Sequence, residues 1–135
     1  MRSSEASAGN TLGVEDGSFM ATRLEVTELG IEGVTVFLAA GDLDLASAPG
    51  LCETLAQRRG QRVVLDLSTT GFCDLAGMRA IRDEARAGRA AGGLFAIVAP
   101  EGSAARRLLE VAGLMGAVEI HEDQPRAIAR VRPPR

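Results

Sequence analysis

The chain has 135 residues, of which 46% are hydrophobic and 24% charged, a composition typical of one soluble globular domain. All 15 basic residues are arginine, so Schiff-base chemistry and a Walker-type phosphate-binding loop are excluded. The net charge of −3 and the absence of Trp and Tyr argue against a nucleic-acid-binding face.

The two ends of the chain differ in composition from its middle. Residues 1–19 are rich in Ser, Gly and acidic side chains and are predicted to form a disordered lead, whereas residues 20–131 form the domain and residues 132–135 a tail. No basic segment followed by an apolar one begins the chain, and no apolar stretch approaches the roughly 20 residues that span a bilayer. We therefore expect a cytoplasmic protein that does not insert into membranes.

The first half of the domain reads as a hairpin, a helix and a buried strand. Apolar residues alternate over 22–29 and again over 33–41, which predicts two antiparallel strands joined by a turn. Leucines four residues apart predict a helix over 47–60. The continuous apolar run over 62–67 is typical of a central strand covered on both faces.

The second half alternates helices with strands. A long amphipathic helix is predicted over 74–93, a buried strand over 94–99, a helix capped by Ser103 over 103–114, a short strand over 117–123 and a helix over 124–131. The order β-β-α-β-α-β-α-β-α predicts an α/β fold. Its sheet should be mixed but mostly parallel, with four to five strands and one antiparallel edge.

Two loops, residues 39–48 and 67–77, follow predicted strands and should meet at the carboxyl edge of the sheet. In the first, the spacing of Asp42 and Asp44 resembles the start of haloacid-dehalogenase-type phosphatases, in which one Asp is the nucleophile and the next a general acid. The chain lacks the lysine that this chemistry requires. Capping of the next helix by Asp44 or Ser47 is therefore favoured over phosphatase activity.

Other chemistry-bearing residues are few. Cys52 and Cys73 are too far apart in sequence to form a close-spaced metal pair, and His121 lies alone in an acidic stretch where solvation is expected. The cysteines are expected to be reduced and buried, with a redox pair as the alternative if their Cα atoms approach within about 7 Å. No glycine-rich phosphate-binding loop or nucleophile–histidine set is present, so we expect no cofactor, no metal and no catalysis.

Three short motifs carry a family resemblance, and they occur in one order: Gly41-Asp42-Leu43-Asp44, Asp66-Leu67-Ser68 and Phe72-x-Asp74-x-x-Gly77. With this spacing, residues of about 22–131 resemble the STAS domain of anti-sigma factor antagonists. The resemblance implies a small sheet with packed helices and a binding function. Such antagonists bind an anti-sigma factor, usually a Ser/Thr kinase of the histidine-kinase-like ATPase fold, and so release a sigma factor for transcription.

The phosphorylation site of that family departs from its pattern here. In the family, the kinase modifies the second Ser of the motif D-S-S-G, and this chain has Leu75 and Ala76 at the two serine positions. Ala76 has no hydroxyl, so the resemblance implies either a constitutive binder or control from elsewhere. Ser68, Thr69 and Thr70 are alternative acceptors, and Cys73 is a further regulatory candidate.

The resemblance also predicts a partner-binding surface on the two loops and the start of the long helix. Asp74 is also expected to have a structural role as the N-cap of that helix. Gly77 lowers the stability of the first helical turn, so we expect another chain or a neighbouring strand to approach closely there. Two alternatives stay open, a STAS subunit of a lipid or solute ABC transport assembly and a homodimer. The predicted surface consists of Asp42, Asp44, Ser68, Thr69, Asp74, Leu75, Ala76, Gly77, Met78 and Arg79.

Four arginines follow one another at steps of three, four and three along the predicted long helix, and we call them the arginine ridge: Arg79, Arg82, Arg86 and Arg89. The favoured interpretation is a solvated face on which Asp83 ties Arg79 and Arg86. The alternative is a basic surface facing an acidic partner, which Arg106 and Arg107 would extend.

Overall fold

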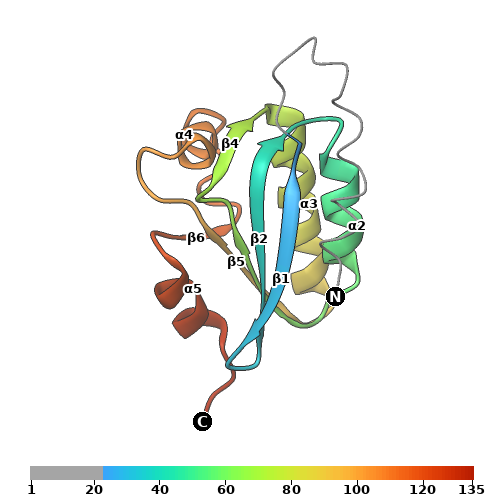
Figure 1. Cartoon of the computed structure of the whole chain (residues 1–135). Coiled ribbons are helices and arrows are strands. Elements are labelled where there is room, and N and C mark those ends of the chain that lie inside the picture. Colours follow the sequence, from blue (N-terminus) through green and yellow to red (C-terminus); the bar gives the residue numbers. More distant parts are fainter. Residues whose placement is uncertain (1–22) are drawn as a thin grey trace.

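The computed structural model describes residues 23–135 (Figure 1), and the predicted lead over 1–19 lies outside them. The predicted α/β class and the mostly parallel sheet with one antiparallel edge are confirmed. Five strands follow the order β1-β2-β3-β5-β6, and β4 pairs with β2 away from this path. The strands are β1 (Glu25–Ile31), β2 (Val34–Leu43), β3 (Arg62–Asp66), β4 (Thr70–Cys73), β5 (Leu94–Val98) and β6 (Glu119–His121).

The predicted hairpin forms the antiparallel edge. Strands β1 and β2 pair from Glu25↔Ala40 to Ile31↔Val34. Glu32 and Gly33 make the turn, and both have positive φ, 53° and 81°. Two such residues twist the strands in the right-handed sense that a two-residue hairpin needs.

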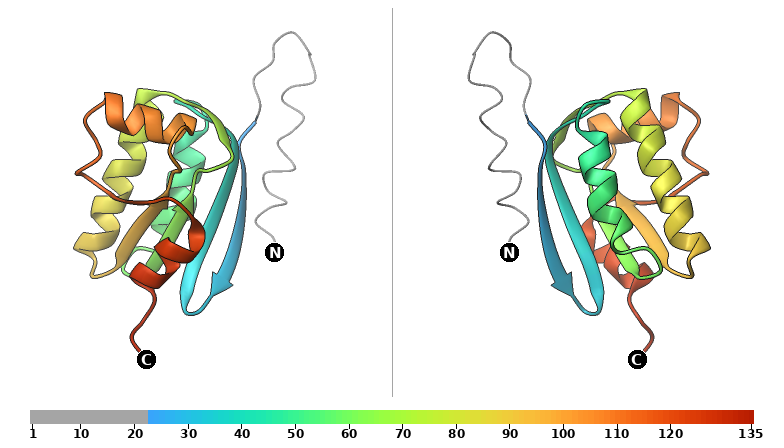
Figure 2. Two further views of the ribbon diagram at one scale, coloured as in Figure 1. Left: turned by 90° about the vertical axis from the view of Figure 1, so that its left-hand side faces the viewer. Right: turned by 90° about the vertical axis from the view of Figure 1, so that its right-hand side faces the viewer.

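The helices cover the sheet unequally (Figure 2). Helices α2 (Ala48–Ala56), α3 (Leu75–Ala90) and α4 (Ala104–Val111) pack on one face over the larger apolar cluster. Helix α5 (Gln124–Val131) covers the other face over a smaller cluster that includes Val36, Val64 and Val98. The alternating residues of β2 divide between the two clusters, as the period of a strand requires.

Strand β4 was not predicted, and the sheet has six strands where four to five were predicted. Strand β2 has ten residues and outruns the five of β3, which leaves its last backbone groups without a partner strand. After a turn in which the N–H of Thr70 donates to the carbonyl of Leu67 at 3.1 Å, the chain extends again and pairs with β2. Strand β4 thus satisfies backbone groups that would otherwise lose their hydrogen bonds.

Two side-chain contacts fix the helices to each other and to the sheet. Arg59, just beyond α2, donates two hydrogen bonds of 2.7 and 2.8 Å to the carboxylate of Glu84, which is buried in α3. On the other face, the side-chain amide of Gln124 donates to Asp66 at 2.7 Å. Each contact gives a buried carboxylate, Glu84 or Asp66, a hydrogen-bond donor without which its burial would be costly.

Two smaller expectations are also settled. Ser103 caps α4, since its hydroxyl accepts from the N–H of Arg106 at 3.2 Å. His121 is not solvated as predicted, because β6 holds it against Glu119 with its Nε2 atom 3.4 Å from the carboxylate. Over residues 23–135, no helix is both long and apolar enough to span a membrane.

Candidate functional site

The two loops at the carboxyl edge of the sheet are joined by Asp74. Its Oδ1 atom accepts from the N–H of Gly77 at 2.7 Å, which confirms the predicted cap of α3. Its Oδ2 atom accepts from the N–H of Leu45 in the other loop at 3.2 Å. The N–H of Asp74 itself donates to the carbonyl of Leu43 at 3.0 Å. One residue therefore starts the helix and positions the neighbouring loop.

Gly77 lies where the first turn of α3 meets the end of β2. A Cβ atom there would be 3.0 Å from the carbonyl oxygen of Leu43 and 3.2 Å from Oδ1 of Asp74. A neighbouring strand, β2, therefore makes the close approach that the glycine in this turn predicted. Gly77 and the next residue, Met78, are both buried, so these two predicted site residues support the surface from beneath and do not face a partner.

The loop that follows β2 is a self-bonded turn. Oδ1 of Asp44 accepts from the N–H groups of Ala46 and Ser47, each at 3.0 Å. The hydroxyl of Ser47 accepts from the N–H of Asp44 at 3.0 Å and donates to the carbonyl of Asp42 at 2.9 Å. Ser47 occupies the N-cap position of α2 without a side-chain capping bond, so the predicted capping by Asp44 or Ser47 is wrong. The side chains of Asp44 and Ser47 bond to backbone groups of the turn, and not to the N–H groups of the first turn of α2.

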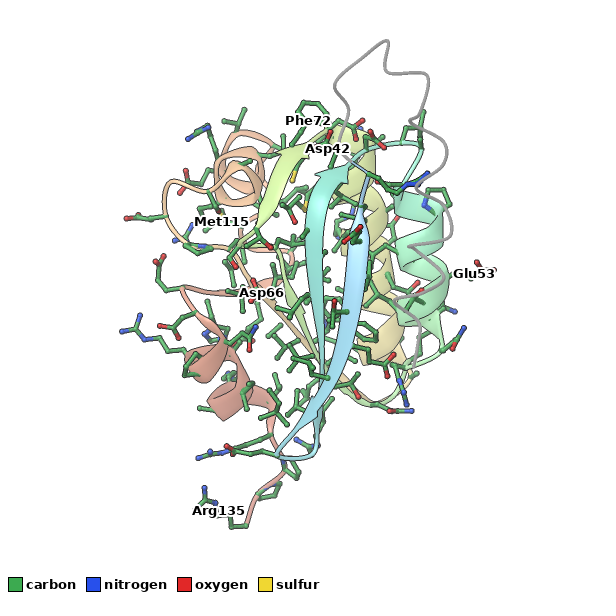
Figure 3. All side chains as sticks on the ribbon, viewed as in Figure 1. Asp42, Glu53, Asp66, Phe72, Met115 and Arg135 are labelled. Atoms are coloured by element: carbon green, nitrogen blue, oxygen red, sulfur yellow. The ribbon has the colours of Figure 1, made fainter. Side chains whose placement is uncertain are left out.

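Asp44, one of the two residues with phosphatase-like spacing, is thus bonded within its own turn. Asp42 is half-buried beside β4, in register with Phe72 (Figure 3). Within residues 23–135, no three His, Cys, Asp or Glu side chains are grouped so that they could hold a metal ion.

Exposed apolar side chains gather on the same loops, and we call Leu45, Phe72, Leu75 and Ala76 the apolar rim. The exposed fractions are 71% for Leu45, 53% for Phe72 and 37% for Leu75, and Ala76 is also exposed. An exposed group of large apolar residues at a loop edge is typical of a protein-binding surface. Sequence reasoning missed Leu45 and Phe72, although the position of Leu45 between two turn-forming side chains was a signal against its burial.

The candidate hydroxyl acceptors differ in access. Ser68 and Thr69 are exposed in the turn between β3 and β4. Thr70 is buried, and its hydroxyl donates to the carbonyl of Ala39 at 2.8 Å. A kinase could therefore reach Ser68 and Thr69 but not Thr70 without opening β4.

Both cysteines are free thiols. Burial, together with the negative charges of Asp74 and Asp42, raises the pKa of Cys73 to about 11. Burial and the nearby acidic groups of α3 also raise the pKa of Cys52. A raised pKa keeps a thiol protonated at neutral pH, which is the opposite of what a reactive redox sensor needs.

The arginine ridge is less neutralised than the sequence suggested. Asp83 pairs with Arg82 at 3.0 Å, and the predicted ties to Arg79 and Arg86 do not form because the guanidinium of the adjacent residue takes both short contacts to Oδ1. Arg79 and Arg86 are exposed and have no partner among residues 23–135. Arg106 does not extend the ridge, because its side chain is bonded to Ala99 and Glu122.

The sequence motifs and this geometry agree with one family. The family model described as STAS domain matches residues 26–127, most of the chain. The chain belongs to the STAS domain family. The comparison with curated protein sequences gives no match.

Solved structures share the fold of this STAS domain. An anti-sigma factor antagonist from Mycobacterium paratuberculosis is 24% identical, with 82% of this chain and 95% of that chain covered and a TM-score of 0.69. The Bacillus anti-sigma factor antagonist SpoIIAA in its unphosphorylated form is 18% identical, with coverage of 84% and 100% and a TM-score of 0.59. The murine anion transporter Slc26a9 is 16% identical and has a TM-score of 0.63, with 91% of this chain but only 24% of that chain covered.

Proposed function

We propose that this STAS domain is an anti-sigma factor antagonist. It binds an anti-sigma factor of the Ser/Thr kinase type in the cytoplasm and thereby releases a sigma factor for transcription. The observation that carries the proposal is the apolar rim, built on the two loops whose motifs resemble those of such antagonists. Two of the solved structures that share its fold bear that name.

The rim has the properties of a binding site and lacks those of an active site. Leu45, Phe72 and Leu75 offer apolar area that a partner can cover, which is the main source of affinity between proteins. Asp74 and Asp44 are engaged in backbone hydrogen bonds that hold the loops in place before binding. A pre-positioned surface loses less conformational freedom on binding, which suits a docking module.

The binding of this module is controlled differently from that of the family members that are released by phosphorylation. Ala76 is exposed beside Leu75, at the position where the family pattern has the acceptor serine, and its methyl group cannot be phosphorylated. The complex therefore persists in the presence of kinase and ATP. Ser68 and Thr69 remain accessible as substitute acceptors.

The test is calorimetric titration of the full chain with each purified kinase-type anti-sigma factor encoded in the same genome. We expect one of them to bind, and Phe72→Arg to weaken that binding by about 30-fold or more because it places a charge in the apolar contact. Leu94→Arg is the matched control, since Leu94 is a similarly exposed apolar residue at the start of β5. If no anti-sigma factor binds, the function is wrong; if both variants bind equally well, the rim is not the surface used.

A transport assembly is the second candidate, favoured by the likeness to the Slc26a9 anion transporter over 91% of this chain. In that case the rim would contact a membrane permease. Co-purification from detergent-solubilised membranes distinguishes the two, because an antagonist should be recovered with its anti-sigma factor from the soluble fraction.

A further inference from the structure

The arginine ridge runs continuously from the apolar rim along α3. Leu75 precedes Arg79 by four residues, and the later arginines follow at steps of three, four and three. At 100° per residue, these five side chains fall within about 80° of arc on one side of the helix and extend over about 21 Å of its length. Leu75 therefore belongs to both surfaces.

The ridge keeps a net positive charge in a chain that is acidic overall. Of the two acidic residues on α3, Asp83 neutralises Arg82, and Glu84 is buried against Arg59 on another side of the helix. Arg79 and Arg86 are exposed and unpaired among residues 23–135. No contact within the described fold accounts for these two guanidinium groups.

We propose that the ridge binds an acidic surface of the same protein that covers the apolar rim, an inference that rests on the proposed function and adds the chemistry of the partner. Arg79 and Arg86 are seven residues apart, so their side chains stand about 10 Å apart on one side of α3. Carboxylates at a matching spacing, such as those seven residues apart on a helix, would meet both. Exposed charges of this kind mainly raise the rate of association and fix the orientation of the partner.

The observations favour a protein over a nucleic acid or a membrane. The ridge begins at an apolar residue of a protein-binding surface, and no Trp or Tyr interleaves with it as a stacking platform. The net charge of −3 would also repel a polyanion from the rest of the molecule. A protein with one acidic patch meets the ridge without this penalty.

The test measures association rates with the anti-sigma factor that the titrations identify, at about 50 mM and about 500 mM NaCl. At the lower salt, Arg79→Glu/Arg86→Glu should reduce the association rate constant about tenfold or more and change the dissociation rate less than about twofold. At the higher salt, the difference should disappear. The control variant Arg126→Glu/Arg135→Glu makes the same change of net charge on exposed residues near the C-terminus. It should change the association rate less than about twofold.

The outcomes separate this inference from the proposed function. Equal association rates for wild type and the ridge variant, or an equal reduction in the control variant, would overturn the inference that the ridge binds an acidic surface. Neither result would contradict the proposed function. If no anti-sigma factor binds, the function fails, and the ridge is tested by following backbone amide shifts during titration with an oligoglutamate peptide. Shifts confined to α3 and lost in the ridge variant support an acidic protein ligand. Scattered or absent shifts, or tighter binding of single-stranded DNA or phosphatidylglycerol vesicles than of the peptide, overturn it.

Discussion

The carboxylate of Asp74 accepts a hydrogen bond from the backbone N–H of Leu45, 3.2 Å away and 29 residues earlier in the chain. Its other oxygen accepts from the N–H of Gly77 and caps α3. The side chain of Leu45 is the most exposed of the three large side chains in the apolar rim. The placement of a residue of the proposed binding surface in one loop thus depends on a helix cap in the other.

Replacing Asp74 by Ala should lower the free energy of unfolding by about 1–2 kcal/mol, because two backbone N–H groups lose their acceptor. Urea denaturation measures the loss. Asp123→Ala removes the equivalent cap of α5, where Oδ1 of Asp123 accepts from the N–H of Arg126 at 3.0 Å, and should have a similar effect. Only the Asp74 variant should move the amide resonance of Leu45; movement in both variants would contradict the link between the loops.

Gly41→Ala should destabilise the domain by several kcal/mol or prevent folding. Gly41 has φ of 114°, and a Cβ atom there would lie 2.1 Å from the carbonyl oxygen of Arg23. The strain falls where β2 shifts register to meet β4. Gly30→Ala in β1 provides the comparison, since a Cβ atom at Gly30 meets nothing within 4 Å, and it should change stability by less than about 0.5 kcal/mol. Thermal unfolding measures the stability of both variants. A similar loss of stability for Gly41→Ala and Gly30→Ala would contradict backbone strain at Gly41 as the cause.

Arg59→Met should lower the free energy of unfolding, and by more than the substitution of an exposed arginine elsewhere on the surface. Glu84 is only 6% exposed, and without the guanidinium its charge is left without compensation. The double variant Arg59→Met/Glu84→Met should recover most of the loss, because it removes the buried charge as well. Arg86→Met changes an arginine of α3 that has no partner among residues 23–135, and it should have an effect within about 0.5 kcal/mol. A double variant no more stable than Arg59→Met would count against a buried charge as the cause.

Stability should fall between about pH 9 and about pH 11, and Cys73 should account for part of the fall. The thiol has an ordinary pKa of 9.0 in the unfolded chain, and burial with the nearby carboxylates raises its pKa to about 11 in the fold. Below pH 9 both states hold the proton, and above it the unfolded state loses the proton first, so the free energy of unfolding decreases as pH rises. Urea denaturation at several pH values should give a shallower decrease for Cys73→Ala than for wild type. An unchanged slope would mean that Cys73 does not ionise differently in the two states.

Ala76→Ser should create a phosphate acceptor. With the anti-sigma factor kinase and ATP, intact-mass spectrometry should find one added phosphate on the variant and none on wild type, because the exposed residue 76 lacks only the hydroxyl. The phosphorylated variant should release the kinase, since the added charge lies beside Asp74 in the contact surface. Phosphate on wild type would instead direct attention to Ser68 or Thr69.

The sequence was sufficient for the parts of the fold that periodicity encodes. The hairpin, the cap at Asp74 and the mostly parallel sheet follow from alternation, residue type and element order. Strand β4 was hidden because four residues, Thr70–Cys73, carry too short a pattern, and its formation depends on the unpaired end of β2. Because β4 is stabilised by pairing with a strand that is distant in sequence, its own residues do not show a strand pattern.

The candidate site was predictable in place and less so in detail. The motifs located Asp74 and Ala76, but they did not show that Met78 is buried, because its orientation on α3 depends on packing that a single sequence does not reveal. The pairing of Asp83 with Arg82 was missed for a similar reason. Several arginines lie within reach of one carboxylate, and the choice among them depends on rotamers and solvation.

Among the elements of residues 23–135, helix α5 alone covers the second face of the sheet, and its removal would have consequences beyond lost stability. Opening or truncation of α5 would expose the strip formed by Val36, Val64 and Val98 on three adjacent strands. A newly exposed apolar patch of this kind promotes association with other chains. Partial unfolding would therefore begin aggregation from the C-terminal side. A fluorescent tag or affinity handle is better joined beyond Val131 by a flexible spacer than spliced into the helix.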